Sequence, residues 1–162
     1  MRWRSVGEAD CSIARTLSII GERWTILILR EVFLGRSHFD DFQRNTGIAR
    51  NILSTRLRAL VNHGILERYA APHDRARVEY RLTKKGLDLF PVLVAMLRWG
   101  DQWLADENGP PIALVHRTCG AHATPTMVCP NCGEEISASN MIALPRVRAH
   151  PARRARRLRA AH

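Results

Sequence analysis

The change of hydrophobic period partway along the chain constrains its fold more than any other feature of the sequence. Four segments come first in which apolar residues recur at helical spacing, and a glycine or a short turn ends each of them. These predicted helices cover residues 12–20, 23–34, 38–44 and 49–63. Gly21 follows the first helix, where glycine is favoured, and Ser37 is predicted to cap the third. The tight turn at residues 45–47 predicts a helix-turn-helix.

After Gly64 the period becomes that of β-structure. Residues 65–70 and 78–82 are predicted strands, joined into a hairpin by a turn-rich loop at 72–76. Thr83 then caps a final helix that reaches about residue 107, and Pro91 is expected to kink this helix because it cannot donate a backbone hydrogen bond. This order of elements describes a winged helix-turn-helix. The alternative is a generic three-helix domain with an incidental hairpin.

The motif Asn108-Gly-Pro-Pro111 marks a boundary after the final helix. We therefore predict a mainly α fold with a β-hairpin wing, followed by a small C-terminal β module of zinc-ribbon type and a basic tail. The expected segments are an N-terminal arm, a DNA-binding and dimerisation domain, a Cys-rich module and an Arg-rich tail: 1–10, 11–107, 108–145 and 146–162.

The positive charge of the chain is concentrated at its end. The 162 residues carry a formal net charge of +10, and residues 146–162 hold seven Arg and no acid. This composition predicts disorder and a salt-dependent affinity for phosphate that has no sequence preference. Residues 1–107 hold 17 basic and 13 acidic residues, a modest excess. Specific DNA binding must therefore be argued from the placement of charge in these residues.

Motifs of enzymes and of membrane or secreted proteins are not found. The chain has no Gly-rich phosphate loop, no Gly-x-Ser-x-Gly motif and no His-Glu-x-x-His motif, so we expect no catalytic activity. No apolar run approaches the roughly 20 residues of a membrane span. The apolar region of a signal peptide does not follow the first four residues, so we expect no signal peptide. Four Cys without a secretory signal favour a reduced, cytoplasmic protein.

The fourth predicted helix has two contrasting faces. Leu53, Leu57 and Leu60 form one stripe that should face the core. The other side has no acid and carries amide, hydroxyl and guanidinium groups that can hydrogen-bond base edges and phosphates in a major groove. Its residues are Arg50, Asn51, Ser54, Thr55, Arg58 and Asn62. The alternative is a polar face that only contacts solvent. The preceding short helix and tight turn favour contact with DNA through Arg50, Asn51, Ser54, Thr55 and Arg58, and we add Ser37 and His38 to the predicted contacts.

Three further arginines have separate expected roles. Arg56 lies close to the leucine stripe and is predicted to be structural, paired with Asp40, Asp41 or Glu22. Arg75 and Arg77 flank Ala76 at the tip of the hairpin, where they could enter a minor groove or bind phosphate. The alternative is a solvated hairpin tip.

Five segments of the chain together resemble the HxlR-type winged-helix regulators, which are related to the MarR group. They are Cys11-Ser-Ile-Ala-Arg-Thr-Leu-Ser-Ile-Ile-Gly-Glu-Arg-Trp-Thr-Ile-Leu-Ile-Leu-Arg-Glu, Phe39-Asp-Asp-Phe-Gln-Arg, Gly47-Ile-Ala-Arg-Asn-Ile-Leu-Ser-Thr-Arg-Leu-Arg-Ala-Leu, Gly64-Ile-Leu-Glu-Arg and Tyr80-Arg-Leu-Thr-Lys-Lys-Gly. The resemblance covers roughly residues 11–107. It implies a dimeric bacterial regulator that binds double-stranded DNA at a pseudo-palindromic operator near its target gene.

The resemblance also suggests roles for residues outside the helix-turn-helix. It implies a dimer interface formed by the first and last helices, where Leu17, Trp99 and Trp103 are the candidate contacts. The alternative is that the two tryptophans pack on their own domain. Cys11 matches the N-terminal cysteine that senses oxidants or electrophiles in some members of the family. Arg15 would favour its thiolate, whereas Glu8 and Asp10 would oppose it. The alternative is a packed interface cysteine.

The Cys-rich module contains two segments of the same form. His116-x2-Cys119-Gly and Cys129-x2-Cys132-Gly each place a second ligand just before a glycine, as in a zinc knuckle. They predict a structural Cys₃His zinc site. His122 also lies three residues from Cys119 and is the alternative histidine ligand. A module that keeps its cysteines without metal, or a pocket for an unknown effector, remains a further alternative.

These observations predict a homodimeric, sequence-specific transcriptional regulator. We expect it to be a repressor, although the sequence itself does not distinguish repression from activation. Two other functions compete with it. One is a thiol- or zinc-based sensor of oxidants or electrophiles whose output is DNA binding. The other is a protein-interaction adaptor that uses the winged domain without DNA.

Overall fold

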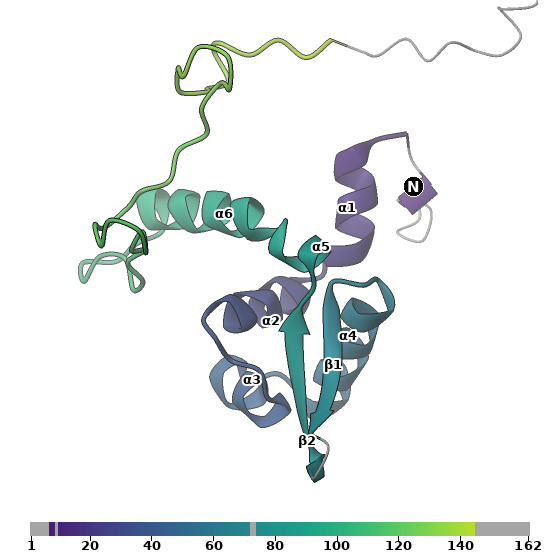
Figure 1. Cartoon of the computed structure of the whole chain (residues 1–162). Helices are drawn as coiled ribbons and strands as arrows, with labels where there is room; N and C mark the ends of the chain where they lie inside the picture. The colour runs from purple at the N-terminus through teal and green to yellow at the C-terminus, as the bar shows by residue number, and fades with distance from the viewer. Residues whose placement is uncertain (1–6, 9, 72–73, 145–162) are drawn as a thin grey trace, which may run out of the picture. The chain divides into compact units, whose positions relative to one another are not determined.

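The computed structural model of the chain describes residues 7–8, 10–71 and 74–144 (Figure 1). The chain divides into two compact units, Met1–Ala113 and Leu114–His162. The arginine tail predicted at 146–162 lies outside the described residues.

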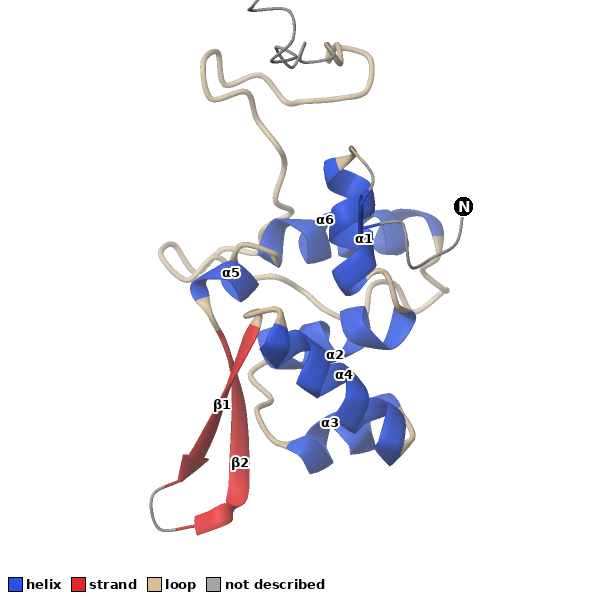
Figure 2. Ribbon diagram, turned by 90° about the vertical axis from the view of Figure 1, so that its right-hand side faces the viewer, coloured by secondary structure: helices blue, strands red, loops and turns tan. Residues whose placement is uncertain are grey.

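The first unit is mainly helical, with one antiparallel hairpin (Figure 2). Its elements are α1 (Ser12–Ile20), α2 (Arg23–Phe33), α3 (Phe39–Thr46), α4 (Arg50–Asn62), β1 (Leu66–Ala71), β2 (Asp74–Leu82), α5 (Lys84–Leu87) and α6 (Phe90–Trp103). In order and in kind these elements confirm the winged helix-turn-helix. The hairpin lies beside α4 and extends to the same end of the unit as α3 and α4, whereas α1 and α6 lie at the opposite end.

The core of the first unit lies between α2, α3, α4 and the base of the hairpin. The predicted stripe of Leu53, Leu57 and Leu60 is fully buried, and it packs in one cluster with Ile28 of α2 and Phe42 of α3. Burying an apolar side chain of this size contributes about 1.5–3 kcal/mol. The leucine stripe therefore fixes which face of α4 is turned outward.

The predicted cap of α3 is wrong. The residue at the N-cap of α3 is His38, which makes no side-chain capping hydrogen bond, and Ser37 lies one residue further out. Residues 37–38 pair with the hairpin instead: the amide of Tyr80 donates to the carbonyl of Ser37 at 2.8 Å, and His38, whose backbone is extended, forms a β-bridge with Glu79. This pairing with β2 holds Ser37 outside the helix.

Gly21 does end α1, but not in a left-handed conformation. Its φ is −72°, which any residue can adopt. A Cβ atom at this position would overlap the carbonyl oxygen of Leu17. Gly21 is therefore required by the close approach of the backbone.

The hairpin and the last helix differ in their bounds from the prediction. Strand β2 begins at Asp74, so residues 74–76 belong to a strand and not to the loop. The cap by Thr83 is confirmed, since its Oγ1 accepts from the amide of Gly86 at 3.1 Å. The predicted long helix is instead two helices, and Pro91 lies in the first turn of the second, α6. Backbone N–H groups in the first turn have no acceptor within the helix, so the lack of one in proline costs no helical hydrogen bond. Pro91 thus begins a helix and does not kink one.

The second unit is described over residues 114–144 and contains no regular strand there. Two isolated antiparallel bridges, Val115↔His122 and Val128↔Glu135, close two short turns. The predicted β module is thus observed only as these turns. Throughout the described part of the chain, every helix is too short or too polar to span a membrane.

Candidate nucleic-acid interface

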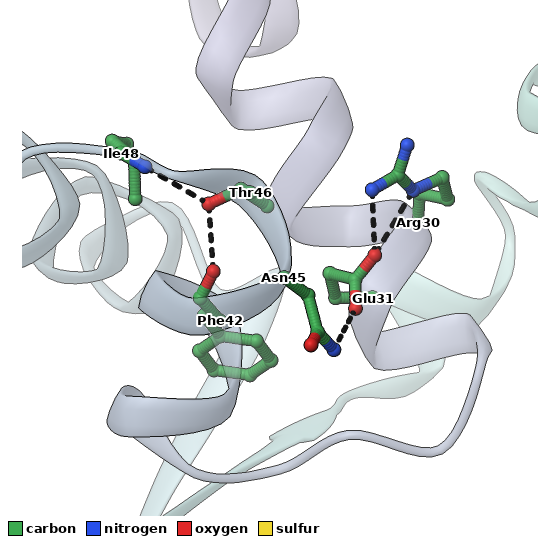
Figure 3. Close-up of polar contacts among 6 residues, drawn as sticks. All are labelled: Arg30, Glu31, Phe42, Asn45, Thr46 and Ile48. Atoms are coloured by element: carbon green, nitrogen blue, oxygen red, sulfur yellow. Dashed lines mark hydrogen bonds and ion pairs between the residues drawn. The ribbon is translucent and has the colours of Figure 1, made fainter.

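A buried carboxylate joins α2 to α3 (Figure 3). The side chain of Glu31 is only 4% exposed, and its Oε1 accepts from Arg30 Nε at 3.0 Å and Nη2 at 2.7 Å. Its Oε2 accepts from Asn45 Nδ2 at 2.7 Å. Asn45 lies in the last turn of α3. The network therefore fixes the C-terminal end of α3, which leads into the turn before α4.

The turn between α3 and α4 is held by its own side chains. Thr46 Oγ1 donates to the carbonyl of Phe42 at 2.6 Å and accepts from the amide of Ile48 at 3.4 Å. Gly47 has φ +68°, a left-handed conformation that favours glycine. Ile48 is buried beside Phe42 in the core cluster. The direction of α4 relative to α3 is therefore fixed by local contacts.

The outer face of α4 has the predicted character. Arg50, Asn51, Thr55 and Arg58 are exposed, and Ser54 is half-buried. No acidic residue occurs in α4. The helix thus presents guanidinium, amide and hydroxyl groups together on a single surface.

Arg50, at the start of α4, is held against α3. Its Nη1 lies 3.3 Å from Gln43 Oε1 and 3.5 Å from Asp40 Oδ1, and its guanidinium lies 4.7 Å from the centre of the Phe39 ring. The side chain is still 70% exposed. Arg50 is therefore oriented in advance while its charge stays accessible to an anion.

The structural role expected for Arg56 is confirmed, with Glu22 as the partner among the three candidate acids. Arg56 Nε lies 3.2 Å from Glu22 Oε2. Glu22 is also the N-cap of α2, because its carboxylate accepts from the amide of Trp24 at 3.0 Å. One carboxylate thus joins α4 to the start of α2.

The loop before α3 and the hairpin are joined at the base of the wing. His38 Nδ1 lies 3.3 Å from the carbonyl oxygen of Val78. With the Ser37–Tyr80 bond described above, this contact gives Ser37 and His38 a structural role, whereas their predicted contact with DNA stays a prediction. Arg75 lies within β2, as does Arg77, and their side chains are outside the described part.

Further along β2, Arg81 forms a compact group with its neighbours. Its guanidinium hydrogen-bonds Glu79 Oε2 at 2.7 Å and lies 4.6 Å from the centre of the Tyr69 ring. The hydrogen bond from Arg81 to Glu79, together with the charge of that carboxylate, raises the pKa of Arg81. This charge is partly balanced within the wing and is therefore less available to DNA than that of Arg58.

The structure adds one residue that we did not predict. Arg68 of β1 lines a depression of about 350 Å³ together with Ser54 and Arg58 of α4, and with Tyr80 of β2. Two arginines from different elements therefore flank one hollow between helix and wing. Residues two positions apart in a strand point to the same side. The spacing of Leu66 and Arg68 was therefore the sequence signal that both side chains face α4.

The cysteines occupy two environments. Cys11 is exposed and is the N-cap of α1, and the neighbouring Arg15 Nη1 lies 4.0 Å from Asp10. In the second unit, His116 Nδ1 lies 3.3 Å from Cys119 Sγ. The backbone amides of Cys132 and Asn131, followed by the Cys132 side chain, hydrogen-bond the sulfur of Cys129 and lower its pKa. Among the described residues, no three His, Cys, Asp or Glu side chains are close enough together to hold a metal ion.

The fold and the outer face of α4 define a winged helix-turn-helix DNA-binding protein. Residues 19–108 match the HxlR-like helix-turn-helix family, and the chain belongs to that family. An uncharacterised HTH-type transcriptional regulator of Mycobacterium tuberculosis, Rv3095, is 51% identical over 130 residues, which are 80% of this chain and 82% of the relative. The chain is accordingly a transcriptional regulator that binds DNA and is not an enzyme.

Solved structures support the same assignment. PA1607, a candidate transcription factor, is 36% identical with a TM-score of 0.77, and the match covers 86% of this chain and 98% of that one. The redox regulator HypR in its oxidised form is 31% identical with a TM-score of 0.54, over 59% of this chain and all of its own. The likeness to PA1607 thus extends beyond the residues that define the family, whereas the likeness to HypR covers a smaller share of this chain.

Proposed function

We propose that the protein is a homodimeric repressor that reads a pseudo-palindromic operator, with α4 in the major groove and the hairpin on the backbone or in the minor groove. The observation that carries this proposal is the acid-free outer face of α4, whose N-terminal half presents Arg50, Asn51, Ser54 and Thr55. Side chains at the start of a recognition helix reach base edges in this fold class.

Within this proposal the contacts have different tasks. Asn51 is suited to a bidentate contact with adenine, and Arg50 to guanine or to phosphate. Arg58 and Arg68 flank the hollow between helix and wing, where a phosphate would meet two guanidinium groups. Arg75 and Arg77 would extend these contacts along the wing, and the arginines of residues 146–162 would add attraction without sequence preference.

An apolar surface at the opposite end of the first unit supports the dimer. A cavity of about 690 Å³ is lined by residues of α1, α2 and α6, among them Ile13, Leu17, Ile20, Ile26, Val92 and Met96. Trp99 and Trp103 are exposed on the same helix as Val92 and Met96, at spacings of three or four residues that place them on one stripe. An exposed apolar stripe beside an apolar cavity is unusual in a monomer.

A second copy of the chain is the occupant that fits this surface. A two-fold axis through α1 and α6 would leave both α4 helices free, because α1 and α6 lie away from α3, α4 and the hairpin tip. Two reading helices about 34 Å apart would then match successive major grooves on one side of the DNA. A repressor arranged in this way would act by covering its operator.

A pair of matched variants tests the dimer. Met96 and Leu87 are 52% and 54% exposed, but only Met96 lines the cavity. Met96→Glu should convert the dimer to a monomer in sedimentation equilibrium and weaken operator binding, whereas Leu87→Glu should leave both unchanged. Equal masses for both variants and the parent protein would contradict the proposed interface.

An electrophoretic shift assay with the intergenic DNA next to the gene tests the DNA contacts. Arg50→Ala should lose operator affinity, whereas Lys84→Ala, which removes a charge from α5, should lose little. A reporter fused to the same promoter should be expressed more strongly in a strain that lacks the protein. Equal affinity losses in the two variants would contradict the role of Arg50, and lower reporter expression in that strain would contradict repression.

A second candidate function is thiol-based sensing with DNA binding as its output. It is favoured by the exposed Cys11 at the start of α1, next to the residues that line the apolar cavity, and by the similarity to the redox regulator HypR. Diamide should then change operator affinity in the parent protein and not in Cys11→Ser. An identical response in both proteins would contradict a sensing role for Cys11.

A further inference from the structure

The second unit contains two turns that repeat the same local structure. In the first, the amide of Gly120 donates to the carbonyl of His116 at 2.8 Å, and in the second the amide of Gly133 donates to that of Cys129 at 2.8 Å. Both glycines are left-handed, with φ of +70° and +76°. In each turn the closing hydrogen bond is donated by the glycine that follows a cysteine. Glycine adopts this left-handed conformation more easily than any other residue.

The chain also returns in the same way after each turn. The amide of His116 donates to the carbonyl of Ala121 at 2.9 Å, and the amide of Cys129 donates to the carbonyl of Glu134 at 2.8 Å. One antiparallel bridge follows in each case. The two pairs, His116–Cys119 and Cys129–Cys132, therefore share the same backbone conformation as well as the same spacing in the sequence.

The side chains of the first pair are directed toward one another, since His116 Nδ1 lies 3.3 Å from Cys119 Sγ. The second pair, Cys129 and Cys132, occupies the same positions in its own turn. His122, the alternative ligand, forms the isolated bridge with Val115 that follows the first turn.

The unit also has no apolar core of its own in the residues described. Between residues 114 and 144 every residue is exposed or half-buried, including Val115, Met127, Val128, Met141 and Ile142. A segment of this size without a buried core needs a disulfide, a metal or a partner to keep one structure. The cysteines of the unit are free thiols.

We propose that His116, Cys119, Cys129 and Cys132 together bind one Zn²⁺ that joins the two turns into a folded module. Three thiolates and one imidazole complete a tetrahedral shell, so the ion would be structural and would have no open position for chemistry. The nine residues between Cys119 and Cys129 connect the two half-sites. The two pairs do not form one cluster in the described residues, and in the proposal the ion is the group that brings them together. This proposal is independent of DNA binding.

Metal analysis of the full chain purified without chelator tests the proposal. The expected result is one zinc per chain, lost in Cys129→Ser and in Cys119→Ser but kept in Cys11→Ser. His116→Ala should lower the zinc content, whereas His122→Ala should not. Cobalt in place of zinc should give visible bands of a tetrahedral site and a charge-transfer band from thiolate.

A second measurement separates metal binding from misfolding. Far-ultraviolet circular dichroism and operator binding of Cys129→Ser should stay close to those of the parent protein, because the helices belong to the first unit. Zinc added to the metal-free chain should slow hydrogen exchange within residues 114–144. The proposal is overturned if the reduced parent protein binds less than a tenth of an equivalent of zinc, if Cys129→Ser keeps its zinc, or if Cys129 and Cys132 form a disulfide under the same conditions.

Discussion

The bond between Asn45 and Glu31 offers a quantitative test of how the helix-turn-helix is held. Asn45→Ala removes the 2.7 Å hydrogen bond to Glu31 Oε2 and leaves that buried oxygen without its amide donor. A hydrogen bond to a charged group contributes about 1.5–3 kcal/mol. Alanine recovers up to about 0.7 kcal/mol through its helix propensity. The net destabilisation should therefore be about 1–2 kcal/mol, which for a domain of this size lowers the midpoint of thermal unfolding by about 4–8 °C.

Urea and thermal unfolding at one fixed protomer concentration measure this destabilisation, because a dimer's stability depends on concentration. Asn62→Ala is the matched control, since Asn62 is an exposed asparagine at the end of α4 and should change stability by less than about 0.5 kcal/mol. In a Glu31→Gln background the effect of Asn45→Ala should shrink toward that of a neutral hydrogen bond. The reasoning is refuted if Asn45→Ala and Asn62→Ala unfold at the same urea concentration.

Three further predictions address other parts of the chain. Glu22→Ala should lower the free energy of unfolding by about 1–2 kcal/mol because it removes both the cap of α2 and the ion pair with Arg56. Glu22→Gln keeps the cap and should lower it less. Equal urea midpoints for the two variants would contradict these separate contributions of cap and ion pair. Gly21→Ala should destabilise the protein by about 1–3 kcal/mol, since the new Cβ would meet the Leu17 carbonyl oxygen, and an unchanged melting temperature would show that the backbone can move without cost. Deleting residues 146–162 should reduce the slope of log K against log salt by up to about 0.9 for each phosphate that the tail neutralises, while the ratio of operator to nonspecific affinity is kept. An unchanged slope would exclude a contribution of the tail.

Much of the first unit followed from local patterns in the sequence. The leucine stripe of α4 predicted both its buried face and its exposed face, because the helical period links the two. The same argument placed Arg56 between these faces, and the ion pair with Glu22 agrees with that placement. Residues whose environment depends mainly on their own helix were therefore predictable.

Predictions failed where a distant segment determines the local structure. Ser37 was expected to cap α3, but its carbonyl accepts from Tyr80 of β2 and the N-cap position is taken by His38. Arg68 was missed as a neighbour of Arg58 because only the folded hairpin brings β1 beside α4. Pro91 could either kink a long helix or start a new one, and the sequence pattern did not distinguish these outcomes.

The central claim is that the outer face of α4 reads the sequence of the operator. The most direct measurement is the ratio of operator affinity to nonspecific affinity at one salt concentration, for the parent protein, Asn51→Ala and Asn62→Ala. Because a bidentate contact with a base is worth about 1–3 kcal/mol, its removal in Asn51→Ala should lower the ratio roughly 5- to 150-fold, with nonspecific affinity unchanged. Asn62→Ala, at the far end of the same helix, should keep the ratio of the parent protein. If Asn51→Ala keeps the ratio of the parent protein, or if both variants lower it equally, the N-terminal half of α4 does not carry the specificity.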